Sequence, residues 1–269
     1  MGGAMNIKEM LRADFGIEVR IARGIGQRDD PFVVEACSPA EAAHTQLDLL
    51  RCLGRGRSEM WRLLAVETAV GKNAGLQSIR IETVLFKEQE IVTEKRSLYF
   101  DISAVDGQPD AALPIVEWSD NRTAFVATYQ LGWLHFDRAT DNTANQSSLD
   151  ASLFYSGIGA TATVYVYDPS DPSYAALSPT EVRSRELTTA SSQLKLANPS
   201  AESPWPILVR GPFARKHFLI GGDISVVGIA LLGPHVLKLR LTYFDDPKMH
   251  ELMSATVDEF EAIVSAHQH

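Results

Sequence analysis

Apolar and polar residues alternate in several segments of the chain, and this alternation predicts β-strands. It is clearest over residues 79–82, 162–167 and 237–242, and strands with one apolar face are typical of antiparallel sheets. Residues 224–232 are apolar on both faces, which predicts an interior strand. Gly228 lies within that run and indicates a bulge or the close approach of another group to the backbone.

Apolar residues at three- and four-residue spacing predict three helices. Two begin with the same Ser-Pro-x-Glu capping box, at Ser38 and at Ser178. In this motif serine and glutamate satisfy amide groups of the first turn, and proline stands where no amide is needed. We expect the first helix to end at Gly54 and the second before Asn198-Pro199. Asp246 caps the third, which closes the chain.

These elements together predict an α+β protein with antiparallel sheets flanked by helices. A length of 269 residues suits one large or two small domains. We expect loops over residues 103–114 and 138–150, and the second is polar enough to mark a boundary. The predicted domains are therefore 1–144 and 145–269. The two capping boxes raise the alternative that the halves arose by duplication.

The second half resembles the Mog1/PsbP-like group. Over residues 149–269 the order is a strand pair, a helix, three or more strands and a long amphipathic helix. In that group an antiparallel sheet lies between helices. The resemblance rests on element order without a residue motif, so it transfers no functional residue. It implies a binding or accessory role more often than catalysis.

Charge and hydropathy exclude some partners and leave others open. The net charge of −9 repels polyanions, so we expect no nucleic-acid partner. No apolar run approaches the ~18 residues of a spanning helix, and the first ten residues lack the apolar region of a signal peptide. Cys37 and Cys52 are too few for a disulfide framework and fit a reducing compartment. We therefore expect a soluble cytoplasmic protein, although a removed leader would leave no trace.

Motifs for cofactors and metals do not reach the required spacing. Gly24 and Gly26, like Gly157 and Gly159, lack the third glycine of a dinucleotide-binding loop. The segment from Gly54 to Arg57 lacks the Gly-Lys-Ser/Thr ending of a phosphate-binding loop. The histidines are scattered, without the spacing of chelating pairs. We predict no cofactor and no metal site.

The densest cluster of reactive side chains runs from Trp133 to Asp141. On a regular strand Trp133, His135 and Asp137 would share one face. A carboxylate from Asp137 or Asp141 would then orient the His135 ring for base catalysis. The alternative is an ordinary His and Asp at the end of an edge strand, since no nucleophile accompanies them.

Two tyrosines provide a second candidate surface. Tyr165 and Tyr167 share the less apolar face of their strand, beside a proline-rich turn. Tyrosine combines an apolar ring with a polar hydroxyl, which suits ligand contact. The alternative is that the helix beginning at Ser178 covers both rings.

Three functional hypotheses follow. The first is a non-catalytic binding or accessory protein with a protein or small-molecule partner. It rests on the finding that no set of catalytic or cofactor-binding residues has the sequence spacing that its chemistry requires. The second is a hydrolase that uses His135 with Asp137 or Asp141. The third is a component of a homo-oligomeric assembly, with a sheet edge or the last helix as its interface.

Overall fold

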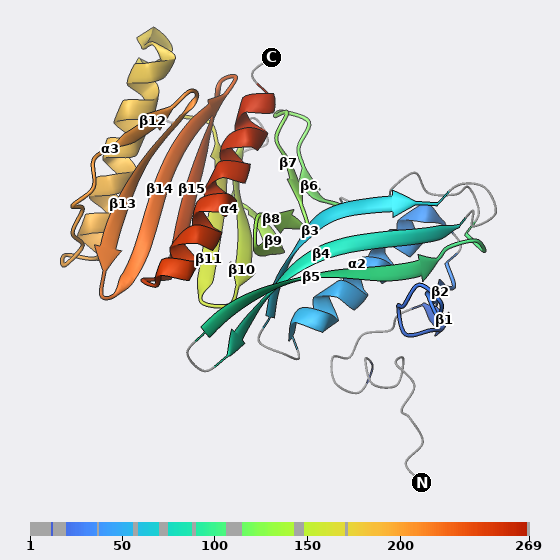
Figure 1. Ribbon diagram of the computed structural model, residues 1–269. Coiled ribbons are helices and arrows are strands. Elements are labelled where there is room, and N and C mark those ends of the chain that lie inside the picture. The colour runs from blue at the N-terminus through green and yellow to red at the C-terminus, as the bar shows by residue number, and fades with distance from the viewer. Residues whose placement is uncertain are drawn as a thin grey trace. The chain divides into compact units, whose positions relative to one another are not determined.

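The structure is a computed structural model that describes residues 12, 20–36, 38–55, 59–69, 75–87, 90–105, 115–142, 148–169 and 172–267 (Figure 1). The chain forms two compact units, Met1–Ile115 and Val116–His269. Each combines helix with mainly antiparallel sheet, which confirms the α+β class. No helix in the described ranges is both long and apolar enough to cross a bilayer.

The first unit is a sheet with one helix against it. Its strands lie in the order β1-β2-β5-β4-β3, and the β2–β5 pair is parallel whereas the others are antiparallel. The Ser38 hydroxyl accepts from the Glu41 amide at the start of the helix, as the capping box predicts. The helix continues to Arg55, one residue past the expected Gly54. The elements are β1 (Ile21–Arg23), β2 (Phe32–Val34), α2 (Pro39–Arg55), β3 (Glu59–Thr68), β4 (Leu76–Lys87) and β5 (Glu90–Asp101).

The second unit is built on an antiparallel sheet in which the described strands lie in the order β12-β13-β14-β15-β11-β10-β9-β8. A separate pair, β6–β7, completes it. Its strands are β6 (Val116–Ser119), β7 (Val126–Thr128), β8 (Gln130–Leu131), β9 (Leu134–Asp141), β10 (Asp150–Gly157), β11 (Ala160–Tyr167), β12 (Leu208–Arg210), β13 (Phe213–Ile220), β14 (Asp223–Leu232) and β15 (His235–Phe244). β14 is interior and buried on both faces, as its sequence predicts.

Two long helices cover opposite faces of this sheet (Figure 1). α3 (Pro179–Ala197) follows the short 3-10 helix η2 (Pro172–Ala176), and both hydrogen bonds of the Ser178 capping box form. α4 (Pro247–Ala266) begins at Asp246, whose carboxylate accepts from the amides of Lys248 and Met249. Both starts confirm the sequence prediction, because each cap satisfies amides that a helix leaves free.

The sheet has different cores on its two faces. Alternate residues of a strand point to opposite faces, so Val227 and Ile229 of β14 pack against Leu194 and its neighbours on α3. Gly228 faces α4, where the Phe213 ring occupies the place that a side chain at this position would need. This close approach is one of the two explanations that the sequence offers for the glycine.

The segment between β9 and β10 differs from the sequence prediction. Residues 138–141 belong to β9 and residue 150 to β10, so the connection is shorter than the expected 138–150 loop. β9 pairs with β10 in one sheet, so the strands on both sides of the predicted 144/145 boundary belong to the same unit, and the chain divides into its two compact units at 115/116 instead. Residues 143–147 themselves lie outside the described residues. Polar, turn-rich residues suit a hairpin loop as well as a linker, which is why composition does not separate the two.

The two units do not repeat one strand arrangement. Among the described residues, the first sheet has five strands with a parallel pair, and the second has eight antiparallel strands. The similar Ser-Pro-x-Glu starts of α2 and α3 thus reflect the same local capping chemistry in different surroundings. Of the two cysteines, Cys52 is a buried thiol of α2, and Cys37 lies outside the described residues.

Candidate functional site

The first predicted cluster is divided between the two faces of the sheet. Phe136 pairs with Tyr155 and Arg138 with Phe154, so β9 contains one more residue than β10 at this point. Asp137 is the additional residue of this β-bulge, and the bulge breaks the alternation on which a shared face for residues 133, 135 and 137 depends. His135 lies on the α3 side of the sheet.

Asp141 lies on the opposite face from His135, because it pairs with Ala151 and not with a residue of the α3 side. The His135 ring nitrogen Nε2 is 3.4 Å from the side-chain amide nitrogen Nε2 of Gln130. Trp133 is buried in the β8–β9 turn, where its amide donates to the Thr256 hydroxyl of α4. The residues of this cluster therefore do not converge on one pocket.

The second predicted pair, Tyr165 and Tyr167, lies beside α3. The Tyr167 hydroxyl donates to the buried carboxylate of Glu186 on α3, with the two oxygens 2.5 Å apart. Burial raises the pKa of Tyr167 above its usual range, and the Glu186 hydrogen bond adds to this. Tyr167 is thus held under the helix, as the structural alternative expects.

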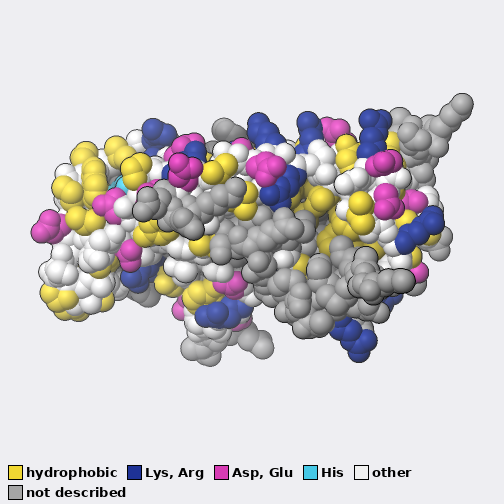
Figure 2. Space-filling model, turned by 60° about the horizontal axis from the view of Figure 1, so that its bottom comes forward, with side chains coloured by type: hydrophobic (Ala, Val, Ile, Leu, Met, Phe, Trp, Pro, Cys, Tyr) yellow, Lys and Arg dark blue, Asp and Glu magenta, His cyan; other side chains and the backbone are white. Residues whose placement is uncertain are grey.

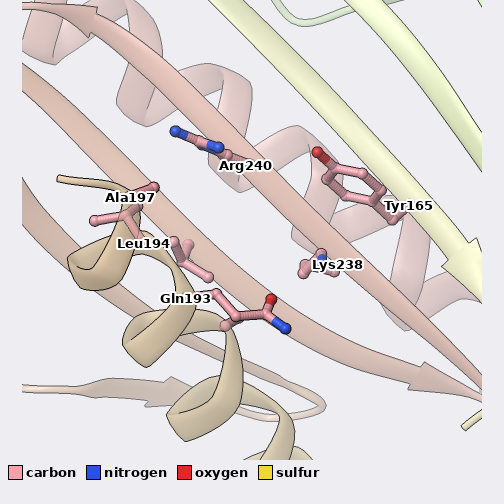
Figure 3. A pocket seen from close by; sticks show the side chains of 8 residues that line it. Tyr165, Gln193, Leu194, Ala197, Lys238 and Arg240 are labelled. Atoms are coloured by element: carbon pink, nitrogen blue, oxygen red, sulfur yellow. The ribbon is translucent and has the colours of Figure 1, made fainter. Parts of the chain in front are cut away.

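Tyr165 instead lines a cleft between α3 and the uncovered part of the sheet (Figure 3). The cleft has a volume of about 150 Å³. One wall comes from Gln193, Leu194 and Ala197 of α3, and the floor comes from β11, β14 and β15. The complete lining is Tyr165, Ala190, Gln193, Leu194, Ala197, Val227, Lys238 and Arg240.

Strand register brings the polar groups of the cleft together. Tyr165 of β11 is directly opposite Lys238 of β15, and Arg240 lies two residues further along the same face. The Lys238 ammonium lies 4.2 Å from the centre of the Tyr165 ring, a cation–π contact. Its distance to the centre of the Tyr167 ring is 5.5 Å.

The two cations of the cleft lack a carboxylate in direct contact. Within the described ranges, neither Lys238 nor Arg240 forms an ion pair, and Arg240 forms no hydrogen bond. Burial lowers the pKa of Lys238, and the Glu186 charge partly opposes this. The Tyr165 hydroxyl also has no hydrogen-bond partner among the described residues. The cleft therefore presents two positive charges and a free hydroxyl to whatever enters it.

Several other basic residues of the protein have acidic partners close by. Arg62 pairs with Glu82 on the first sheet, with 2.7 Å between nitrogen and oxygen, and Arg122 pairs with Asp120 at the same distance. Figure 2 shows basic side chains interspersed with acidic ones across the visible face. Lys238 and Arg240 differ from these pairs. Among the described residues they share the lack of an ion pair with Lys216 on the same face of the sheet and with Arg183 and Arg185 of α3.

Lys238 and Arg240 were not singled out by the sequence, in which they are the polar members of an alternating strand. Their alternation with Leu237, Leu239 and Leu241 correctly indicates that one face of this strand is accessible to solvent. The sequence does not reveal that this strand pairs with the strand of Tyr165, because register depends on contacts between segments 73 residues apart.

Comparisons with known proteins do not assign the site. The chain matches no protein-family model, and none of the curated proteins searched has significant sequence similarity to it. Within the described residues, histidine, cysteine and carboxylate side chains do not gather in groups of three or more that could hold a metal ion.

Proposed function

We propose that this is a non-catalytic binding protein that holds an anionic small molecule in the cleft between α3 and the sheet. The observation that carries the proposal is the pair Lys238 and Arg240, which face one cleft without a carboxylate in contact. Two like charges side by side repel one another, and a bound anion would relieve this repulsion, although Arg240 is exposed and is also screened by solvent. The resemblance to the Mog1/PsbP-like group, in which binding roles predominate, agrees with this function.

The lining suggests how the anion would be held. Arg240 presents several N–H donors, Lys238 adds a point charge, and the Tyr165 hydroxyl adds a further donor. Leu194 and Val227 form apolar contacts beside these groups. The cleft volume of 150 Å³ equals about five water molecules at their share of liquid volume. A phosphate-sized head group fits these dimensions and this charge.

Inorganic phosphate is the probe for the first test. We expect saturable binding by isothermal titration calorimetry, and we expect the affinity to fall as salt rises because the site is partly exposed. Arg240→Gln and Lys238→Gln should each weaken binding about tenfold, the usual size of a lost charge-assisted hydrogen bond.

Lys216→Gln supplies the matched control, because Lys216 lies on the same face of the sheet but does not line the cleft. It should leave phosphate binding unchanged. An equal loss in all three variants would show that net charge, and not the cleft, attracts the anion. Absence of saturable binding to phosphate, or binding that survives both cleft substitutions, would refute the proposal.

A further inference from the structure

A second cavity lies on the opposite face of the same sheet, between α4 and β13–β15. Its volume is about 220 Å³. Its floor and one wall are apolar, and an aromatic ring and several polar groups stand around them. The lining includes Trp205, Arg215, His217, Val226, Tyr243 and Met253. None of them belongs to the cleft beside α3.

Arg215 is a charged side chain at a buried position of this cavity. Its exposed fraction is only 7%. The nearest carboxylate oxygen, of Asp258, is 3.8 Å from its guanidinium, which is too far for a hydrogen bond. Asp258 is half exposed and is shared with Arg210 at the same distance. Among the described residues the Arg215 guanidinium has no hydrogen bond, although it offers five donors.

His217 adds a second polar group without a partner. Its Nε2 atom is buried and has no hydrogen bond among the described residues. Burial lowers the pKa of His217, and the Arg215 charge lowers it further, so the neutral ring is favoured at neutral pH. The Trp205 ring packs against the histidine, with 6.1 Å between ring centres. A buried polar atom without a partner is costly, so it commonly marks a place that a ligand completes.

The third polar group is already satisfied within the protein. His250 accepts from the Tyr243 hydroxyl through Nδ1 and donates to Asp245 through Nε2, at 3.2 and 2.7 Å. Burial raises the pKa of Tyr243 to about 12, so the hydroxyl keeps its proton and can donate. Ser254 also lines the cavity, but it is exposed. The free hydrogen-bonding capacity at the buried positions of the cavity is therefore concentrated at Arg215 and His217.

We infer that this cavity is a binding site for a small monocarboxylate with an apolar or aromatic body. Arg215 would hold the carboxylate in a two-pronged contact, and the His217 Nε2–H would donate to one of its oxygens. The body would lie on Val226, Met253 and the neighbouring apolar side chains. A single buried cation matches a single negative charge, whereas a phosphate dianion would remain half neutralised in this apolar setting.

The size of the cavity agrees with such a ligand. Its volume of 220 Å³ corresponds to about seven water molecules. Drug-sized ligands occupy pockets of about 300–1,000 Å³, so this cavity suits a smaller molecule. Trp205, 39% exposed, stands at the side of the cavity. Its ring would contact an aromatic body and report binding by fluorescence.

Benzoate and benzamide form the pair of probes that tests this inference. They share a ring, but only benzoate has a negative charge. We expect benzoate to bind saturably to the full-length protein, measured by calorimetry and by the change in tryptophan fluorescence. We expect benzamide to bind at least about tenfold more weakly, because it lacks the charge-assisted contact. Trp205→Phe should remove the fluorescence change and leave the calorimetric signal.

Arg215→Gln and Arg210→Gln form the matched pair of variants. Both arginines lie 3.8 Å from Asp258, but only Arg215 lines the cavity. Arg215→Gln should weaken benzoate binding about tenfold or more, and Arg210→Gln should not change it. Asp258→Asn gives an independent test if Arg215→Gln does not fold. It frees the guanidinium from a competing carboxylate, so benzoate should bind roughly threefold more tightly.

Three results would overturn the inference. The first is no saturable binding of benzoate at millimolar concentration. The second is equal binding of benzoate and benzamide, which would mean that the apolar surface alone attracts the ring. The third is unchanged benzoate affinity in both Arg215→Gln and Asp258→Asn. Stronger binding of inorganic phosphate than of benzoate, lost in Arg215→Gln, would replace the monocarboxylate by a phosphate ligand and would also contradict the inference.

Discussion

Gly228→Ala tests the packing between the sheet and α4. A Cβ atom at this position would lie 2.1 Å from Cζ and 2.5 Å from Cε2 of the Phe213 ring. That ring is 1% exposed and packs edge-on against Phe260, with ring centres 5.5 Å apart. Gly228 is not among the glycines with positive φ. The backbone therefore accepts alanine, and the cost comes from the ring.

Overpacking of a filled core costs about 1–3 kcal/mol. We expect about 2–3 kcal/mol for Gly228→Ala, because the Phe213 ring is enclosed on its other side by Phe260 and must shift as a whole. The assay is urea unfolding of the full chain at constant pH. Hydrogen exchange of the β14 amides gives the stability of this sheet separately from that of the first unit.

A double substitution separates this mechanism from a general loss of stability. Phe213→Leu alone should cost about 1–2 kcal/mol through lost burial. It also clears space beside residue 228, so the double variant Gly228→Ala/Phe213→Leu should cost at least ~1 kcal/mol less than the sum of the two. Additive losses, or a negligible effect of Gly228→Ala, would refute the reasoning.

Three further predictions concern the stability of the second unit, which carries both proposed sites. Asp246→Ala removes the cap of α4 and should lower the free energy of unfolding by ~1 kcal/mol in urea, whereas Asp246→Asn should retain most of it. Gly132→Ala should destabilise by at least about 2 kcal/mol, measured as a fall in Tm, because φ is +59° and the Cβ would lie 2.5 Å from the Thr256 backbone. Hydrogen bonds from Arg122 lower the pKa of Asp120 to about 2. The ionised form is favoured in the folded state, so this pair stabilises above about pH 4 and the effect is lost as pH falls toward 2. Asp120→Asn should therefore cost ~1 kcal/mol at pH 6, after allowing for solvent screening, and only a small fraction of that at pH 2, where about half of the Asp120 carboxyls are protonated in the folded state.

Local chemistry explains most of what the sequence predicts correctly. The Ser178 box and the Asp246 cap depend on residues within one helical turn, so each helix start can be read without knowing the fold. The burial of β14 follows from its composition alone. The residue-228 contact is also signalled, because a glycine inside an apolar strand indicates that another group needs its space.

Features that depend on strand register or on a β-bulge cannot be predicted from such local patterns. One extra residue in β9 moves His135 and Asp141 to opposite faces of the sheet. No residue type in this segment indicates that a bulge forms there. Arg215 has a clearer signal. In β13 it lies two residues after the buried Phe213 and shares its face of the sheet, so a charged residue stands at an inward position of the pattern. Such a position is unusual for arginine, because buried charged residues are nearly always paired.

The most direct test of anion binding at Lys238 and Arg240 is the position of a bound anion in a crystal. Selenate resembles phosphate in size and shape, and its anomalous scattering identifies it without ambiguity. A crystal soaked in selenate should show its strongest anomalous peak in the cleft, within hydrogen-bond distance of the Lys238 ammonium and the Arg240 guanidinium, and the peak should vanish in Arg240→Gln. An empty cleft beside fully occupied sites elsewhere on the surface would contradict the proposed function.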